Sequence, residues 1–440
     1  MSVLGLADGL RRDEAGQEMY GLVEELYPIG RSITGDGVRE TLRRLQKEIP
    51  LTVHEVPTGT PVFDWTVPKE WNVREAYVAN ARGERVIDYR RSNLHLVGYS
   101  VPVRARMRLD ELRPRLHTLP ERPAWIPFRT SYYRETWGFC LAHQDLDRLE
   151  DGEYEVVVDT TLADGALTYG EYAIAGRRDD EILISCHVCH PSLCNDNLSG
   201  IALATVLARA LAGCAPRYSY RFLFIPGTIG SITWLARNRE RVSRIAHGLV
   251  LACLGDPGRV TYKRSRRGDA VIDRAARHVL SARDHAIVDF TPWGYDERQY
   301  CSPAFDLPVG CLSRTPHGRF PEYHTSADDL TLVRPEALAD SLGVVLEILG
   351  VLEGDARYRS TNPACEPQLG RRGLYRALGG ATGPPDEMPL LWVLNQADGR
   401  HTLLDVAERS GIEFRRIRRA ADLLLEHGLL ADGGGEGGRR

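Results

Sequence analysis

Residues 181–211 read EILISCHVCHPSLCNDNLSGIALATVLARAL. The first part is an apolar strand that ends at His187, and the Asp-Asn-Leu-Ser-Gly turn beginning at Asp196 opens a helix. A second segment, PEYHTSADDL at 321–330, places His324 between aromatic and hydroxyl residues. Strand ends that present His and Asp beside a helix start are a common way to build a zinc centre. The two segments together therefore predict a metal site.

The surrounding pattern predicts an α/β fold. From about residue 154 onward, apolar strand-like runs such as YEVVVDT, EILISC and YRFLFIP alternate with helical segments. This alternation is typical of a mostly parallel sheet with helices on both faces. Ligand sites in such sheets lie beyond the carboxyl ends of the strands, where His187 and Asp196 fall.

Two other parts of the chain differ in character. Residues 53–152 hold short strand-like runs broken by Pro, Gly and Asn, together with four of the seven tryptophans. Near the C-terminus, three short helical segments with a Thr402 N-cap and a Gly411 stop indicate a winged helix-turn-helix. We expect three domains: a zinc-peptidase-like α/β domain over 1–52 and 153–358, an inserted β-rich domain over 53–152, and a winged helix-turn-helix over 386–432.

The composition narrows the range of partners and compartments. The 440 residues are 43% hydrophobic and carry a net charge of −4, which argues against nucleic acid as a partner of the whole chain. No apolar run is long enough for a transmembrane helix, and the N-terminus lacks the features of a secretory signal. An odd count of nine cysteines, scattered through apolar segments, indicates reduced thiols. We therefore expect a cytoplasmic protein, and a homo-oligomer is compatible with the sequence.

The motif CHVCH at 186–190 has two other interpretations. It matches the C-x-x-C-H pattern of covalent haem attachment, but it ends a predicted buried strand and no export signal accompanies it. A structural zinc knuckle on Cys186, Cys189 and Cys194 lacks a matching second C-x-x-C pair. Strand burial is the simplest explanation of Cys186.

His187, Asp196 and His324 are the predicted metal ligands. Neutral imidazole and carboxylate are normal zinc donors. Taken singly, each residue is equally explained by a helix N-cap or a hydrogen-bonded core histidine, but their arrangement makes a shared site the better interpretation. For His190 the sequence leaves three roles open, namely a ligand, a partner of a ligand or a substrate contact.

These residues resemble the zinc aminopeptidase clan that also contains the glutaminyl cyclases. The likeness rests on His187, on the DNLSG turn at 196–200 and on the YHT run at 323–325. It covers roughly residues 16–50 and 155–355. With the insert and the winged helix, the chain looks most like bacterial aminopeptidase-like proteins often found with polysaccharide or natural-product biosynthesis. The resemblance implies a zinc cofactor and amide hydrolysis.

The chain departs from the clan at several positions. There, glutamates after the next strand supply a metal ligand and the general base, whereas Gly227 here lies in a segment without any acid. Cys189 replaces the aspartate that orients the first histidine, and only Asp256 is near the place of a further aspartate ligand. One zinc on the three predicted ligands is the simplest interpretation, which leaves the fourth position open for water. Two ions remain an alternative.

A base and substrate contacts must come from elsewhere in the chain. The loop at 293–300, WGYDERQY, offers Glu297 as the base or an extra ligand, with Asp296 as the alternative. A solvated turn explains the same residues without catalysis. The predicted substrate contacts are His190, Arg314, His317 and Tyr323.

Three functions from different classes follow. The leading hypothesis is a zinc-dependent hydrolase that cleaves an amide bond in a small peptide or aminoacyl conjugate. The second is a catalytically inactive aminopeptidase-like fold that binds a small amino compound or a protein partner, which the missing acid at Gly227 favours. The third, a DNA-binding regulator, rests on four arginines of the last helix: Arg415, Arg416, Arg418 and Arg419.

Overall fold

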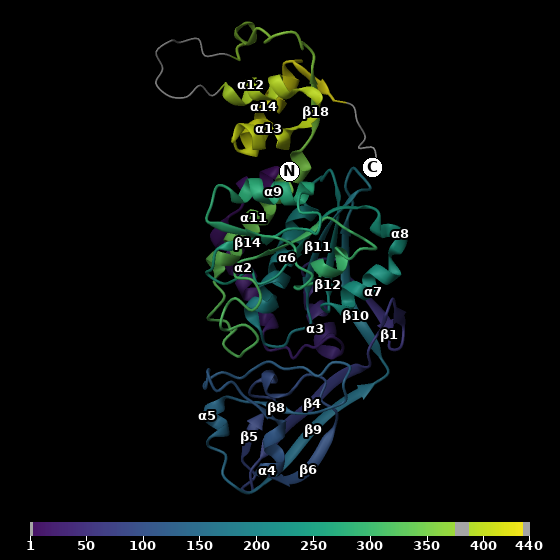
Figure 1. Cartoon of the computed structure of the whole chain (residues 1–440), viewed down its shortest axis with the longest axis vertical. Coiled ribbons are helices and arrows are strands. Elements are labelled where there is room, and N and C mark those ends of the chain that lie inside the picture. The colour runs from purple at the N-terminus through teal and green to yellow at the C-terminus, as the bar shows by residue number, and fades with distance from the viewer. Residues whose placement is uncertain (1–2, 375–386, 434–440) are drawn as a thin grey trace. The chain divides into compact units, whose positions relative to one another are not determined.

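A computed structural model of the chain describes residues 3–374 and 387–433 (Figure 1). The chain divides into two compact units. The first comprises Leu10–Ala270 and His285–Gly343, and the second comprises the described parts of Ser2–Gly9, Val271–Asp284 and Val344–Arg440. The β-rich segment 53–152 lies within the first unit. The expected domain boundaries remain predictions, and residue 386, the first of the third predicted domain, lies outside the described residues.

An eight-stranded sheet organises the first unit, in the order β1-β10-β12-β11-β13-β16-β14-β15. Its four central strands, β12, β11, β13 and β16, run parallel, whereas β1 and β10 at one edge are antiparallel. At the other edge β14 pairs antiparallel with β16 and parallel with β15. The strands are β1 (Thr52–Pro57), β10 (Ala166–Ile174), β11 (Glu181–His187), β12 (Ser219–Ile225), β13 (Ile245–Leu251), β14 (Val260–Lys263), β15 (His285–Val288) and β16 (Val309–Ser313).

Strand β11 is buried at every position. Since successive side chains of a strand point to opposite faces, both faces of the sheet must be covered. Helix α6 (Ser199–Ala212) packs on β11, β12 and β13, with α2 (Arg12–Leu26) against it. Side chains of α7 (Ile229–Arg237), including Trp234, join a core with Leu183 and Val250. The predicted α/β fold, a mostly parallel sheet flanked by helices, is confirmed.

The helices of the first unit connect and cover these strands. Besides α2, α6 and α7, they are α3 (Asp36–Leu45), α4 (Leu109–Leu112), α5 (His143–Leu146), α8 (Arg239–Val242), α10 (Glu297–Tyr300) and the first part of α11 (Pro335–Gly354). Short α10 lies against β16 and α7. That contact brings the loop before α10 to the carboxyl end of the parallel strands, where ligand sites form in such sheets.

A second sheet lies in the segment between β1 and β10. Its four antiparallel strands have the order β5-β4-β9-β6, and Figure 1 shows this sheet apart from the large one. The strands are β4 (Glu70–Ala79), β5 (Arg85–Asp88), β6 (Val103–Arg108) and β9 (Glu153–Ala163), with the short pairs β2 (Pro61–Val62) and β3 (Trp65–Thr66), and β7 (Leu116–His117) and β8 (Phe139–Cys140). Trp71 is buried here, and its indole donates to the Ser100 carbonyl at 2.9 Å. The segment is β-rich, as its turn signals indicate.

One loop of this β-rich segment reaches the strand-end region of the large sheet. Pro127 forms an antiparallel bridge with Thr325. On either side, Phe128 N–H donates to the His324 carbonyl at 2.8 Å, and Ser326 N–H donates to the Ile126 carbonyl at 2.8 Å. Residue 324 has a positive φ of 56°, a backbone conformation that non-glycine residues adopt only where their surroundings hold it. The β-rich segment therefore fixes the chain that carries one predicted metal ligand.

The second unit contains a three-stranded sheet in the order β18-β17-β19, together with helices. Thr402 caps its helix as predicted, because its hydroxyl accepts from Asp405 N–H and the Asp405 carboxylate accepts from Thr402 N–H. Gly411 ends that helix with a φ of 68°. The elements are β17 (Arg357–Ser360), α12 (Met388–Gln396), β18 (Asp398–Thr402), α13 (Leu403–Ser410), α14 (Phe414–Glu426) and β19 (Leu430–Asp432), with α1 (Val3–Asp8) and α9 (Val271–Leu280).

The last helix, α14, does not leave all of its arginines free for phosphate. Arg418 pairs with Asp422 and also donates to the Gly354 carbonyl and the Tyr358 hydroxyl.

Among the described helices, none combines the length and the apolar character that crossing a membrane requires.

Arg221 in β12 supplies a stability prediction. It is 5% exposed and pairs with Glu181 and Glu171 on the neighbouring strands. Arg221→Met should lower the free energy of unfolding by about 3–5 kcal/mol, because buried carboxylates lose their counter-charge. Urea denaturation measures the change. Adding Glu181→Gln and Glu171→Gln should recover much of it, and a single variant as stable as the wild type would contradict this account of the sheet.

Candidate metal centre

The centre is built where β11 ends and α6 begins. His187 is the last residue of β11, and Asp196 lies in the irregular turn η3 (Cys194–Leu198) that precedes α6. Asp196 is fully buried and His187 is 2% exposed. Sequence neighbours hold this turn, since Asn197 donates to the Leu251 carbonyl at 3.0 Å and accepts from Cys253 N–H. The turn is thereby fastened to the end of the adjacent strand β13.

The side chain of Asp328 supports the turn that carries Asp196. Asp328 is fully buried and accepts from the N–H groups of Asn195 at 2.6 Å and Asp196 at 3.0 Å. Burial, with a contribution from the charge of Asp196, raises the pKa of Asp328 to about 8. Asp328 follows the predicted ligand His324 by four positions, but spacing alone did not reveal it as a partner of the Asp196 turn.

Three histidines converge on Asp196. His187 Nε2 lies 2.8 Å from Asp196 Oδ1, and His324 Nε2 lies 3.0 Å from Oδ2. His190 Nε2 lies 3.8 Å from Oδ2. The donor atoms of His187, His190 and Asp196 all lie within 4.8 Å of one another. The structure therefore brings together the three predicted ligands and adds His190 to them.

The protonation states suit a metal ion. Burial would raise the pKa of Asp196, but the nearby imidazoles more than offset this and hold it well below its usual value. Burial lowers the pKa of His190 to about 3, so this imidazole is neutral with a free lone pair. Metal binding requires a deprotonated carboxylate and neutral imidazoles.

The donor set fits zinc. Bonds of about 2.0–2.2 Å in a tetrahedral site place neighbouring donor atoms about 3.3 Å apart, close to the 2.8–3.8 Å found around Asp196. The two oxygens of Asp196 face different histidines. The same residues would therefore supply the donors for zinc, and whether one ion or two bind stays a prediction.

A buried arginine fixes the His190 segment. Arg31 donates to the carbonyls of His190 at 2.7 Å, Pro191 at 2.9 Å and Leu26 at 2.7 Å. Burial lowers the pKa of Arg31 to about 10, so it still carries its charge at neutral pH. These hydrogen bonds fix the backbone at His190, which its sequence position does not reveal.

At the positions where the clan carries acids, this chain has none. A Cβ added at Gly227 would lie 3.1 Å from His187 Cβ and 3.4 Å from Asp296 Oδ2. Asp256 lies outside the histidine cluster and accepts instead from Thr315 and Asn195, so it ties loops together.

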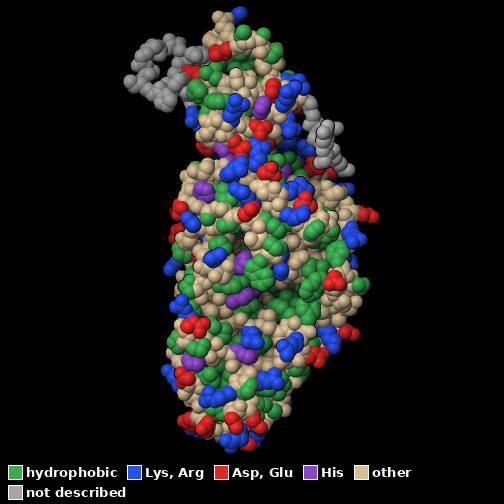
Figure 2. All heavy atoms as spheres, viewed as in Figure 1, with side chains coloured by type: hydrophobic (Ala, Val, Ile, Leu, Met, Phe, Trp, Pro, Cys, Tyr) green, Lys and Arg blue, Asp and Glu red, His purple; other side chains and the backbone are tan. Residues whose placement is uncertain are grey.

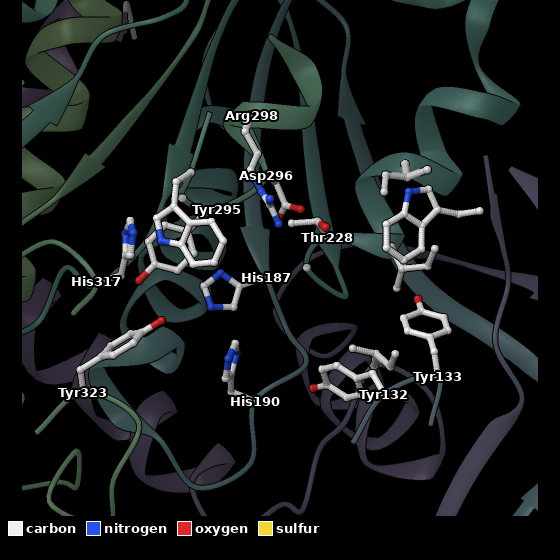
Figure 3. A pocket seen from close by; sticks show the side chains of 17 residues that line it. Tyr132, Tyr133, His187, His190, Thr228, Tyr295, Asp296, Arg298, His317 and Tyr323 are labelled. Atoms are coloured by element: carbon white, nitrogen blue, oxygen red, sulfur yellow. The ribbon is translucent and has the colours of Figure 1, made fainter. Parts of the chain in front are cut away.

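A cavity of about 300 Å³ opens beside the histidines. Figure 2 shows histidine side chains at the surface next to a hollow bordered by hydrophobic side chains, and Figure 3 shows the residues that surround it. Aromatic residues form much of the wall: Trp65, Tyr132, Tyr133, Trp293, Tyr295 and Tyr323. Tyr295 stacks on His187 with ring centroids 4.9 Å apart. The wall residues from 65 to 133 come from the β-rich segment and carry no spacing signal that the sequence could have shown.

Of the two candidate bases, Asp296 lines this cavity. It is fully buried, and its Oδ1 accepts from the Ser231 hydroxyl at 2.7 Å. Its Oδ2 has no hydrogen-bond partner among the described residues. Burial raises the pKa of Asp296 to about 6, so the carboxylate can exchange a proton near neutral pH.

Glu297, the first choice from the sequence, does not line the cavity. Its Oε1 accepts from Lys263 Nζ at 2.8 Å, and the side chain is 1% exposed. Two acids adjacent in sequence thus have different surroundings, because the start of α10 turns them in different directions. The geometry favours Asp296 as the base.

Three of the four predicted substrate contacts line the cavity, and one does not. His190, His317 and Tyr323 line the cavity. Arg314 lies outside the lining, since its guanidinium donates to the Gly258 and Ala337 carbonyls and pairs with Asp340. Arg298 lines the cavity instead.

The chain belongs to a family described as a domain of unknown function (DUF4910), which matches residues 20–355. Residues 356–432 match a winged helix-turn-helix family, so the predicted winged helix is confirmed. A Clostridium acetobutylicum protein is 54% identical over 420 residues, which span 95% of this chain and 96% of that protein. Its name, given there as provisional, is polysaccharide biosynthesis protein with aminopeptidase-like domain.

Solved structures agree with the fold. A crystal structure of a C. acetobutylicum protein, provisionally described as a peptidase, matches with a TM-score of 0.92 at 52% identity, covering 96% of this chain and 97% of that one. The zinc aminopeptidase BSAP from Bacillus subtilis gives 0.56 at 11% identity, covering 76% of this chain and 94% of its own. A peptidase M28 precursor from Shewanella amazonensis gives 0.55 at 14% identity, covering 80% and 96%. The last two show the fold alone, and the expected aminopeptidase-like fold is confirmed.

Asp328 supplies a prediction for the centre. Asp328→Asn places an amide donor against backbone N–H groups, so the Asp196 turn should lose its anchor and zinc affinity should fall about 10–100-fold. Competition with a chromophoric chelator measures the affinity. Asp329→Asn is the matched control, because Asp329 is half-buried and its carboxylate accepts from the N–H and the hydroxyl of Thr331 rather than from the Asp196 turn. Equal zinc affinity in both variants would show that Asp328 does not support the centre.

Proposed function

We propose that this protein is a zinc-dependent hydrolase that cleaves an amide bond in a small peptide or aminoacyl conjugate. The observation that carries the proposal is the pairing of two features at one cavity. The Asp196–histidine cluster suits zinc, and the carboxylate of Asp296 faces the same cavity with an oxygen that no described residue binds. An aminopeptidase-like fold and the name of the C. acetobutylicum relative support a hydrolase that serves polysaccharide synthesis.

Zinc would be held by His187, Asp196 and His324, with His190 as a further donor. When bound, it would act as a Lewis acid on the amide carbonyl and lower the pKa of a bound water. The Asp296 carboxylate would accept a proton from the water molecule whose oxygen bonds to the amide carbonyl carbon. When the C–N bond breaks, the protonated Asp296 returns the proton to the leaving nitrogen.

The remaining cavity residues position the substrate. The aromatic wall provides apolar surface for a side group and excludes water, which strengthens the electrostatic interactions within the site. Tyr323 stacks on His324 with ring centroids 3.9 Å apart, and this contact limits how the imidazole can turn. The small volume restricts the substrate to one of small-molecule size.

A second candidate is a catalytically inactive fold that binds a small amino compound. The observation in its favour is Gly227, where the clan's acids are missing. It differs from the first in having a ligand but no turnover.

Zinc analysis and turnover separate the two. Purified full-length protein should contain one or two zinc ions per chain, and His187→Ala and Asp196→Ala should lose them, because each removes a donor from the cluster. Mass spectrometry of a panel of aminoacyl and N-acyl amides should then show hydrolysis by the wild type. Protein without zinc would overturn the proposal, and zinc-loaded protein that binds but never cleaves these amides would support the inactive fold.

Asp296→Asn should lower kcat by about 10²–10⁴-fold with the zinc content unchanged, since it removes the proton acceptor and no donor of the cluster. The carboxylate form exists above its pKa, which is raised to about 6. The value of kcat/KM should therefore rise with pH, with a midpoint at or below pH 6. A profile of kcat/KM against pH measures this rise. Glu297→Gln is the comparison and should keep kcat within about tenfold. The reverse ranking of the two variants would make Glu297 the base.

A further inference from the structure

Arg298 is a cation in the cavity that no carboxylate of the described residues pairs with at hydrogen-bonding distance, although its charge partly offsets the rise that burial causes in the pKa of the nearby Asp296. Its side chain lines the cavity beside Asp296 (Figure 3). It forms no hydrogen bond or ion pair with the described residues, and its Nε atom is buried without a partner. By contrast, the buried Arg221 pairs with two carboxylates and the buried Arg31 donates to three carbonyls. Arg298 is half-buried, and a buried donor such as its Nε is costly to leave unpaired unless a ligand supplies the partner.

The neighbouring acid does not serve as that partner. Asp296 precedes Arg298 by two positions, yet no ion pair within 4.0 Å joins them. One oxygen of Asp296 is already taken by the Ser231 hydroxyl. The cavity therefore presents a free carboxylate oxygen and a free guanidinium side by side, each facing whatever fills it.

Surrounding groups hold the guanidinium in position for an oxyanion. Its carbon lies 5.7 Å from the centre of the Trp293 ring, so the ring face attracts the cation without using its N–H donors. Thr228, also in the lining, accepts from Gln299 at 3.4 Å. Its hydroxyl proton is thus available for a second acceptor. A planar guanidinium with a hydroxyl beside it matches a carboxylate, which arginine binds through two parallel hydrogen bonds.

The part of the cavity next to Arg298 favours an oxyanion over a free amine. Among the residues that line the cavity, Asp296 is the single acid, and it shares its side of the cavity with the arginine. An ammonium group there would meet a like charge, whereas an oxyanion would balance one. This distinguishes the site from one that selects substrates by a free α-amino group.

We infer that the substrate carries an oxyanion next to the scissile amide and that Arg298 and Thr228 bind this oxyanion. This inference rests on the proposed function. The substrate class is an N-acylated amino acid or a closely similar amide with a free carboxylate or phosphoryl group. Its apolar side group lies against the aromatic wall formed by Trp65, Tyr133 and Trp293.

A binding experiment tests this inference separately from turnover. It uses small probes in which no scissile amide lies next to an anion. The probes are 3-phenylpropionate, its neutral amide, 2-phenylethylphosphonate and 3-phenylpropylamine, each titrated calorimetrically into the zinc-loaded full chain. The carboxylate should bind at least about tenfold more tightly than the neutral amide, because a charge-assisted pair replaces a neutral contact. The phosphonate arm shows which oxyanion fits better.

Arg298→Gln should reduce this preference to within about twofold, and Arg319→Gln should preserve it. Arg319 is an exposed arginine two positions after His317 and does not line the cavity. Tighter binding of the amine than of the carboxylate would overturn the inference. So would a preference that survives Arg298→Gln but disappears when a chelator removes zinc, because the carboxylate would then bind the metal. Because these probes need no cleavage, they give a result even if hydrolysis is never found.

Discussion

The structure depends on the position of one buried carboxylate. Asp196 has no exposure to solvent and meets the imidazoles of His187 and His324 within 3.0 Å. A buried charge of this kind is stable only when opposite charge or strong donors surround it. The N–H bonds from its own turn to Asp328, and the loop of the β-rich segment that holds residue 324, are what keep those partners in place.

A second buried carboxylate, that of Asp296, can supply the general base that the segment around Gly227 lacks. With glycine at 227, no side chain occupies the space between His187 and the loop before α10, and Asp296 approaches this space from a different part of the chain. Its environment differs from that of Asp196. Burial raises the pKa of Asp296 to about 6 despite the nearby charges of His187 and Arg298, whereas the histidines hold the pKa of Asp196 well below its usual value. Two carboxylates with separated pKa values are suited to proton transfer and ligation respectively.

Local pattern was enough to predict the strand-end histidine and the Asp196 turn, because each belongs to a strand or turn that the sequence shows. It was also enough for the α/β fold and the winged helix. The late histidine was expected from its own run of residues, but its position depends on the loop of the β-rich segment. The choice between Asp296 and Glu297 was not accessible, since both begin one short helix and differ only in what tertiary packing brings near them. Arg314 looked like a binding residue by type, but its partners, among them Asp340, are distant in sequence.

The β-rich segment is part of the site rather than an attachment to it. Phe128 donates its N–H to the His324 carbonyl, and its ring lies 5.1 Å from that imidazole and 5.4 Å from His190. Tyr132 and Tyr133 continue from there into the cavity wall. The fold therefore explains how the metal centre is supported, but it does not determine which substrate fits. Substrate choice depends on residues that the inserted segment and the loop before α10 contribute, and this is why the charge of Arg298 says more about the substrate than the fold does.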